Sequence, residues 1–362
     1  MRIEDEIKLT FDDVLIRPKR STLVSRSEVV LERQFKFKHT DETWTGIPIF
    51  SANMDTTGTF ETAITLQKHK MLTAIHKFYS ITDWEKNIEN LDPNFIAVTV
   101  GQSKEDLDLG KKIFSLDNKI KYLCIDVANG YREDFINSVK NYRETFPDKI
   151  IIAGNVATRE MTEALILAGA DVVKIGIGPG SVCTTRSIAG VGYPQLSSIS
   201  ECSDAAHGLG GHVMADGGCK YPGDISKAFG AGADYVMLGG MFAGHKESGG
   251  ELVTDENGVQ YKDFYGMSST KAQQTYYGDL ADHRAPEGKK VRLKYKGDLD
   301  KTIQSILGGM RSACSYVGAK KLKDLPKSTT FIRVTQTTTE IFTAPMRLTL
   351  VPVSLNMKLH FQ

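Results

Sequence analysis

The sequence has few cysteines and no excess of charge of either sign. Five of its 362 residues are cysteine, no two of them form a C-x-x-C pair, and their number is odd. Lys and Arg number 45 against 44 Asp and Glu, which gives a formal net charge of +1. So balanced a charge argues against a protein that grips nucleic-acid phosphates or an anionic membrane. We therefore expect a reduced, cytoplasmic protein without a disulfide framework and with neither nucleic acid nor membrane as partner.

Long apolar runs are missing as well. No run approaches the roughly 18 residues of a membrane span, and the charged N-terminus MRIEDEIKLTF lacks the apolar core of a secretory signal. The hydrophobic fraction of 41% is nevertheless enough for a full core. Glycine, with 33 residues, is slightly more frequent than the usual ~7%.

Eight short apolar runs recur along the chain, each followed by a turn and a helix-compatible stretch. Most are rich in Val, Ile and Leu with little alternation, which is typical of strands buried on both faces. They lie at residues 48–51, 72–76, 95–100, 122–127, 150–155, 172–176, 212–216 and 235–239. Eight such units predict a (β/α)8 TIM barrel, and an open doubly wound sheet is the alternative.

Three departures from the regular spacing modify this barrel. The long step from the sixth run to the seventh indicates an inserted element. The polar stretch 246–296 predicts a mobile flap after strand eight, and a helical pattern resumes at 302–307. Residues before the first strand are expected to cover the bottom of the barrel. We predict one catalytic domain over residues 1–342 and a C-terminal extension of unknown role over residues 343–362.

Polar residues and glycines follow the predicted strands, where barrel enzymes place their active sites. The loop GIGPGSVCTTR after strand six carries Cys183 beside Thr184, Thr185 and Arg186. A thiol next to a cation and backbone N–H groups should have a lowered pKa, as a nucleophile requires. The alternative is a buried cysteine in a turn, which is the reading we prefer for Cys124 inside strand four.

Two neighbouring strand ends carry paired glycines. Asp216-Gly217-Gly218 follows strand seven and Gly239-Gly240 follows strand eight. In many barrels these two loops bind phosphate, and an Asp beside bare backbone suits ribose hydroxyls. The alternative is an Asp that caps a helix and glycines that only make turns. Together the loops predict a phosphate-bearing small molecule, such as a nucleoside monophosphate.

At this point several segments resemble one known family, that of IMP dehydrogenase and GMP reductase. They are SANMDT, IDVANGY, GIGPGSVCTTR, GVGYPQL, DGG, MLGGMFAG, FYGMSS and RAPEGK. They cover about residues 1–342 in order, and the pattern is most similar to the GMP reductases. The resemblance implies a (β/α)8 barrel and NADPH-dependent reductive deamination of GMP to IMP with release of ammonia.

Two alternatives remain beside this reading. IMP dehydrogenase shares the cysteine loop, but residues 262–296 contain no Arg-Tyr pair of the kind that a dehydrogenase flap uses to activate water. The spacing of strands two and three also leaves no room for an inserted regulatory domain. The other alternative is a non-catalytic nucleotide-binding barrel, against which the set Cys183, Thr185 and Glu287 argues.

The resemblance also implies a role for individual residues. Cys183 would attack C2 of the purine to form a covalent thioimidate, and Thr185 with Glu287 would relay a proton to the leaving ammonia. The implied substrate-binding residues are Ser181, Asp216, Gly217, Gly218, Gly239, Gly240, Gly266, Met267, Ser268, Arg284 and Gly288.

Cofactor and cation positions follow in the same way. The implied NADPH contacts are Ser25, Arg26, Lys77, Asp126, Val127, Ala128, Ile177, Gly178, Met267, Ser312, Ala313, Cys314 and Ser315. Among them, Ser25, Arg26 and residues 312–315 would reach the cofactor of a neighbouring subunit, which implies a homotetramer. The implied potassium (K+) site comprises Gly178, Gly180, Cys183 and Arg186. Phe78 stands where a second polar ring would be expected after His76-Lys77.

Overall fold

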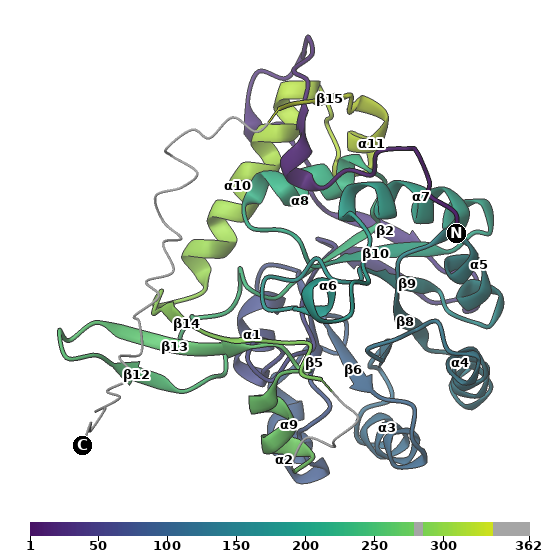
Figure 1. Ribbon diagram of the computed structural model, residues 1–362, viewed down its shortest axis with the longest axis vertical. Coiled ribbons are helices and arrows are strands. Elements are labelled where there is room, and N and C mark those ends of the chain that lie inside the picture. Colours follow the sequence, from purple (N-terminus) through teal and green to yellow (C-terminus); the bar gives the residue numbers. More distant parts are fainter. Residues whose placement is uncertain (279–284, 336–362) are drawn as a thin grey trace, which may run out of the picture.

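The chain folds into a closed barrel of eight parallel strands. The computed structural model describes residues 1–278 and 285–335 (Figure 1). The barrel strands are paired in the order β10-β11-β4-β5-β6-β7-β8-β9, and the ring is closed. Their bounds are β4 (Ile49–Ser51), β5 (Leu72–Ile75), β6 (Ile96–Val100), β7 (Tyr122–Asp126), β8 (Ile150–Val156), β9 (Val172–Ile175), β10 (His212–Asp216) and β11 (Tyr235–Leu238). Each predicted strand is confirmed, and the barrel rather than an open sheet is the architecture.

Helices follow the strands and surround the barrel (Figure 1). They are α1 (Phe60–Gln67), α2 (Ile81–Asn87), α3 (Lys104–Leu116), α4 (Glu133–Thr145), α5 (Arg159–Leu167), α7 (Gln195–Gly208), α8 (Pro222–Gly230) and α10 (Asp300–Val317). The extra element expected after strand six is the loop that carries the short helix α6 (Thr185–Ile188) before α7. The predicted eighth helix is α10, which is longer at both ends than its sequence pattern.

Several helix starts are fixed by local side chains. The Ser103 hydroxyl accepts the Asp106 N–H at 3.1 Å, while the Asp106 carboxylate accepts the Ser103 N–H, also at 3.1 Å, at the start of α3. Ser80 and Asp83 make the same reciprocal pair at the start of α2. Such a capping box satisfies backbone donors that have no partner within the helix. The positions at which these helices begin are therefore determined by short stretches of sequence.

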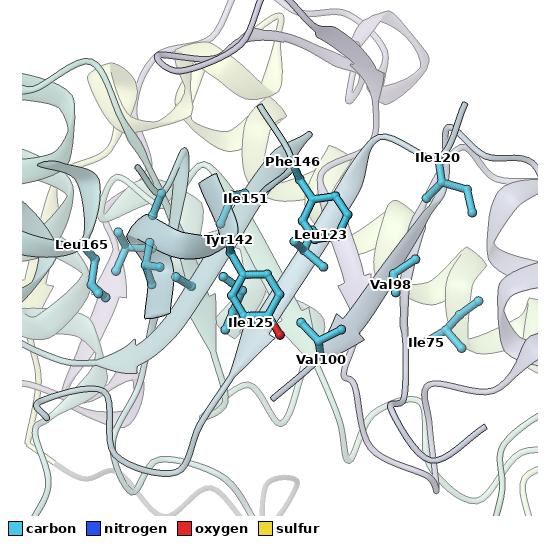
Figure 2. Close-up of a cluster of buried hydrophobic side chains, with 14 of the residues drawn as sticks. Ile75, Val98, Val100, Ile120, Leu123, Ile125, Tyr142, Phe146, Ile151 and Leu165 are labelled. Carbon is cyan, nitrogen blue, oxygen red and sulfur yellow. The ribbon is translucent and has the colours of Figure 1, made fainter. Parts of the chain in front are cut away.

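Each barrel strand buries both of its faces. In β7, Tyr122 and Cys124 pack inside the barrel, whereas Leu123 and Ile125 pack against the surrounding helices, and all four are fully buried. Figure 2 shows the outer layer, in which Tyr142 and Phe146 lie over the strands. The strand sequences show no alternation of polar and apolar residues because neither face of these strands meets water.

The N-terminal segment closes the bottom of the barrel, as expected. A hairpin of β2 (Arg33–Lys36) and β3 (Thr43–Gly46) carries Phe35 and Trp44 into the lower core. The Phe35 ring stacks on Tyr235 with centroids 4.6 Å apart. Other described elements are η1 (Phe11–Asp13), β1 (Val14–Ile16), η2 (Arg26–Glu28), η3 (Ile88–Asn90), η4 (Leu322–Asp324), α11 (Leu325–Ser328) and β15 (Phe331–Arg333). Of these, η1 lies at the opposite end of the barrel, because a Cβ on Gly218 after β10 would lie 3.2 Å from the Phe11 ring.

The polar stretch after strand eight has more regular structure than its sequence indicates. It forms an antiparallel sheet of β12 (Leu252–Thr254), β13 (Gln260–Tyr265) and β14 (Lys290–Lys294), with α9 (Thr270–Tyr276) between the last two strands. This sheet projects from the side of the barrel (Figure 1). Its mobility stays a prediction, and the predicted extension 343–362 lies outside the described residues. Among the described helices, none has the length and apolar character needed to cross a bilayer.

Candidate active site

The loop that follows β9 brings the candidate nucleophile to the open end of the barrel. The thiol of Cys183 donates to Thr185 Oγ1 at 3.2 Å, and Thr185 Oγ1 donates to Glu287 Oε2 at 2.7 Å. The three side chains therefore form one continuous hydrogen-bonded chain. Thr185 and Glu287 are 102 residues apart in the sequence, so the contact depends entirely on the fold.

Backbone bonds hold the two segments of this chain together. Thr184 N–H donates to the Glu287 carbonyl at 2.9 Å, and Lys289 N–H donates to the Val182 carbonyl at 2.9 Å. On the other side, Glu287 N–H donates to the Ser268 carbonyl at 3.1 Å. A side chain at Gly288 would meet Ser269 N at 2.9 Å, so only glycine lets the strands approach this closely. Glu287 is thus clamped between the cysteine loop and the segment after β13.

A cavity of about 230 Å³ opens onto this chain of side chains. It receives residues from the ends of the five strands β4, β7, β8, β9 and β10, and from the segments after β13 and α9. Of the predicted site residues it is lined by Asp126, Val127, Ala128, Ile177, Gly178, Gly180, Cys183, Thr185, Asp216, Gly266, Met267, Ser268 and Glu287. The structure therefore joins the three predicted catalytic residues with nine of the predicted substrate and cofactor positions in one place.

The predicted phosphate loops also converge. A Cβ on Gly217 would lie 3.2 Å from Gly180 N, and one on Gly240 would lie 3.0 Å from Ser181 Oγ. Gly217 and Gly218 have φ of 85° and 89°, values that favour glycine. Gly239 lies next to Gly240, with Met54 Sδ 3.5 Å from the position of its missing Cβ. Bare backbone from three loops and the hydroxyl of Ser181 thus gather on one side of the cavity, as an anionic group requires.

Three polar side chains around Asp216 were given no role by the sequence analysis. Lys174 Nζ lies 2.6 Å from Asp126 Oδ1 and 2.8 Å from Asp216 Oδ2. Asn155 Nδ2 donates to the same Asp216 oxygen at 2.9 Å, and Gln195 Nε2 donates to the Asp216 carbonyl at 3.1 Å. The signal for Lys174 was a lysine inside an otherwise apolar strand, VVKI.

The pKa values of Asp126 and Lys174 are set by their pairing with opposite charges. Burial alone would raise the pKa of Asp126, but the Lys174 ammonium outweighs it and the pKa is lowered. Burial would likewise lower the pKa of Lys174, yet the two carboxylates outweigh it and the pKa is raised. Cys124 shows the opposite case, because burial raises the pKa of its thiol to about 12. Cys124 is structural, as expected.

Arg186 serves a different group from the one expected. Its guanidinium donates to the Tyr193 carbonyl at 2.7 Å, and its stem packs against Gly178 and Gly192. The contact recorded for the Cys183 thiol is with Thr185, not with this cation. Arg186 therefore supports the loop from behind instead of flanking the nucleophile.

A second group of predicted cofactor residues lies away from the cavity. Ser25 caps η2, which begins at Arg26 and packs against α10. Ser312, Ala313, Cys314 and Ser315 belong to α10. None of the six lines the described cavity. Cys314 is fully buried, and burial raises the pKa of its thiol to about 11, so its side chain offers no contact to a ligand.

Two further predicted positions do not line the described cavity. Lys77 is not among its lining residues, although its ammonium is near enough to Asp126 to help lower the pKa of that carboxyl. Arg284 lies outside the described residues.

Comparison with known proteins agrees with this geometry. Residues 8–341 match the model of the IMP dehydrogenase / GMP reductase domain. A GMP reductase from Shigella boydii serotype 4 (strain Sb227) is 57% identical over 345 residues, 94% of this chain and 99% of that protein. GMP reductases of Caenorhabditis elegans (54%; 97% and 98% coverage) and Buchnera aphidicola subsp. Acyrthosiphon pisum (strain Tuc7) (58%; 95% and 99% coverage) are similarly close. The chain belongs to the IMP dehydrogenase / GMP reductase family.

Proposed function

We propose that the chain catalyses the NADPH-dependent reductive deamination of GMP to IMP, with release of ammonia. The observation that carries the proposal is the hydrogen-bonded chain Cys183–Thr185–Glu287 at the edge of a cavity with a glycine cradle. Relatives of 54–58% identity that bear the name GMP reductase support it. No comparable observation supports either alternative, the dehydrogenase or the non-catalytic barrel.

In the first half-reaction, the Cys183 sulfur forms a bond to C2 of the guanine. The exocyclic amine is a poor leaving group until it is protonated, and Glu287 acting through Thr185 is placed to supply that proton. Breaking the C2–N bond releases ammonia and leaves a covalent thioimidate on Cys183. In the second half-reaction a hydride adds to C2, the S–C2 bond breaks, and the thiolate returns with IMP as product.

NADPH is the proposed hydride donor, and the described residues fit a nicotinamide cofactor. Asp126, Val127 and Ala128 line the cavity on the side of β7, and the nearby ammonium of Lys77 suits an anionic dinucleotide. When bound there, the cofactor would supply the two electrons that the reductive deamination needs, because C2 exchanges a bond to nitrogen for a bond to hydrogen. Ile177, Gly178 and Met267 line the same cavity and would border the nicotinamide.

The cysteine loop also fits a monovalent cation such as K+. Carbonyl oxygens are the ligands that hard cations prefer. The Gly180 carbonyl accepts the Cys183 N–H at 3.1 Å, whereas the carbonyls of Gly178 and Cys183 accept no hydrogen bond from the described residues. Such an ion would hold the shape of the loop without taking part in the chemistry.

A homotetramer is the proposed assembly. Ser25, Arg26 and the 312–315 turn of α10 lie together but outside the cavity, as residues that serve a neighbour's cofactor would. Beside them the surface exposes large apolar side chains, with Val24 95% and Tyr316 59% exposed. Exposed apolar patches of this kind are typical of subunit interfaces.

The experiment that tests the reaction mixes enzyme, GMP and NADPH and follows the absorbance of the reduced cofactor together with ammonia release. Loss of reduced cofactor with GMP supports the proposal. Gain of reduced cofactor with IMP and NAD, and no reaction with GMP, would indicate the dehydrogenase. Silence in both directions with nucleotide binding retained would indicate a non-catalytic barrel.

A Cys183→Ala variant tests the nucleophile. Because the thiol forms the bond to C2, the variant should bind GMP yet show neither turnover nor a covalent adduct by intact mass. Residual turnover near the wild-type rate would contradict the assignment. Cys219→Ala, a cysteine outside the described cavity, is the matched control and should keep the wild-type rate.

A further inference from the structure

Lys174 is a buried lysine in the wall of the barrel. In β9, Val172 packs inside the barrel, while Val173 and Ile175 pack outside. The alternation of the strand therefore directs Lys174 inward, where its side chain is only 4% exposed. Gly154 on β8 leaves the space for it, since a Cβ there would meet Lys174 Cβ at 2.6 Å.

The ammonium of Lys174 joins two carboxylates that belong to different halves of the site. Asp216 begins the glycine cradle on the substrate side, and Asp126 begins the segment that lines the cofactor side. The two Nζ–O distances of 2.6 and 2.8 Å are those of strong charge-assisted hydrogen bonds. The carboxylates are 30% and 20% exposed, so both face the cavity while the lysine lies behind them.

No other described cation offers both carboxylates a bond. Asn155 donates to Asp216, and Asn53 hydrogen-bonds Asp126, but both side chains are neutral. Lys77 acts on Asp126 and has no hydrogen bond to either carboxylate in the described residues. Cys124 is a neutral thiol beneath the pair, and Glu287 adds a further carboxyl across the cavity. Without Lys174, Asp126 and Asp216 would face each other as partly buried like charges.

We propose that Lys174 is the positioning residue that couples the two halves of the site: its one ammonium holds the substrate-side Asp216 and the cofactor-side Asp126 in place. It acts through these two carboxylates, and the affinity for both ligands depends on it. The inference rests on the proposed function, because that function assigns the two halves to GMP and to the nicotinamide cofactor.

Titration calorimetry with GMP alone and with NADP+ alone tests the coupling. In Lys174→Met both affinities should fall by roughly 30-fold or more at about pH 8.5, because a buried charge pair loses one partner. At about pH 6 one of the two carboxylates should take up a proton and replace the missing positive charge. The ratio of variant to wild-type affinity should therefore recover on acidification, and using the ratio cancels the ionisation of the nucleotide phosphate.

Two further variants separate this role from a packing role. Lys174→Arg keeps the charge and should retain much of both affinities. Adding Asp126→Asn to Lys174→Met removes the opposing carboxylate, so GMP binding should be restored while NADP+ binding stays weak. The control Lys227→Met removes a lysine that pairs with Asp224 at 3.4 Å on α8, and should leave both affinities and their pH dependence unchanged.

The outcomes are distinct. A folded Lys174→Met protein that loses only one ligand, or that loses both without recovery at low pH or rescue by Asp126→Asn, would overturn the proposal. If the single variant does not fold, the Lys174→Met/Asp126→Asn protein decides, since failure to bind GMP would overturn it too. A wild-type chain that binds neither GMP nor NADP+ would instead overturn the proposed function.

Discussion

Three side chains carry the proposed chemistry at the residue scale. Cys183 and Thr185 stand two positions apart in one loop, but Glu287 reaches them from a different part of the chain. A threonine hydroxyl between a thiol and a carboxyl can pass a proton in either direction with little movement. The short Thr185–Glu287 distance of 2.7 Å suits the proposed relay of a proton to the leaving amine.

Replacement of Glu287 by Gln should stop ammonia release. The amide keeps the shape of the side chain but cannot donate a carboxylic proton, so turnover should fall by about 10²–10⁴-fold. Stopped-flow measurement of ammonia and calorimetry with NADP+ check the two sides of the prediction. NADP+ affinity should survive, and an equal loss of affinity would point to a structural role. Glu256→Gln, in the exposed turn between β12 and β13, serves as control.

At the scale of elements, α9 and β13 are tied to the barrel by one carboxylate. Tyr265 at the end of β13 and Tyr276 at the end of α9 both donate to Asp55 Oδ2, at 2.5 and 2.7 Å. Tyr276 also stacks on Phe78 with centroids 3.6 Å apart. Phe78 is thus an aromatic partner for α9, which accounts for an apolar ring at that position.

Loss of the hydrogen bonds to Asp55 should weaken substrate binding, although Asp55 is not among the residues that line the cavity. Tyr265 directly precedes the Gly266–Met267–Ser268 segment that lines the cavity. Each phenol–carboxylate bond is worth about 1.5–3 kcal/mol, so Asp55→Asn should raise the KM for GMP roughly tenfold or more. Steady-state kinetics check this, with Tyr276→Phe expected to give a smaller effect. Tyr277→Phe, whose side chain is 57% exposed, should not change KM, and equal effects of both tyrosine variants would contradict the tie.

A repeated Gly-Ala-Asp motif links helices to the barrel bottom. Asp171 accepts the Ile151 N–H and pairs with Arg143, and Asp234 accepts the Val213 N–H and pairs with Arg33. The sequence shows this motif as two helix stops, whereas the structure shows that each Asp joins neighbouring strands.

His212 makes part of this support dependent on pH. Burial alone would lower the pKa of His212, but the Asp234 carboxylate, 3.4 Å from its Nδ1, outweighs it and the pKa is raised. A group whose folded pKa is raised stabilises the fold fully below its unfolded pKa and loses that contribution as pH rises through the folded value. His212→Gln should therefore lower the unfolding midpoint more at about pH 6 than at about pH 8.5. Urea unfolding at both pH values checks this, and a larger loss at the higher pH would contradict it.

At the scale of the whole molecule, the site is expected to be shared between subunits. The cavity of one chain lacks the Ser25–Arg26 and α10 residues, because these lie outside it in the same chain. If they complete the cofactor site of a neighbour, each active site contains parts of two chains.

Mixing two impaired variants tests this sharing. Cys183→Ala has no nucleophile and Arg26→Ala should bind NADPH poorly, so each homo-oligomer is weakly active. Hybrids formed by refolding the two together contain some sites with both groups intact, and activity should rise above the sum of the parents. The control mixes Cys183→Ala with Glu287→Gln. Both residues are predicted to come from the same subunit in each active site, so every site of a hybrid keeps one of the two defects. Intact sites would form only if Cys183 and Glu287 of one site came from different subunits. This control should therefore show no gain.

The barrel and the positions of its loops could be predicted from the amino-acid sequence. Eight apolar runs at regular spacing suffice for this, because a strand buried on both faces must be apolar throughout and a crossover to a parallel neighbour needs a helix. The glycine pairs and the cysteine loop were likewise visible, since their backbone demands are local. By contrast, the sequence of residues 284–288 is in itself typical of a solvated turn. A role for Glu287 followed only from the resemblance to the family.

Contacts between side chains that are far apart in the sequence could not be predicted and depend on the folded chain. The tertiary structure set Glu287 against Thr185, tied Tyr276 to Asp55, turned Arg186 away from the thiol and placed Lys174 between Asp126 and Asp216. The regular sheet after strand eight was also missed, because its strands are half-exposed and polar. The sequence does not show which group will pair with a charged side chain. A buried charge needs a partner, and which partner it meets depends on the path of the whole chain.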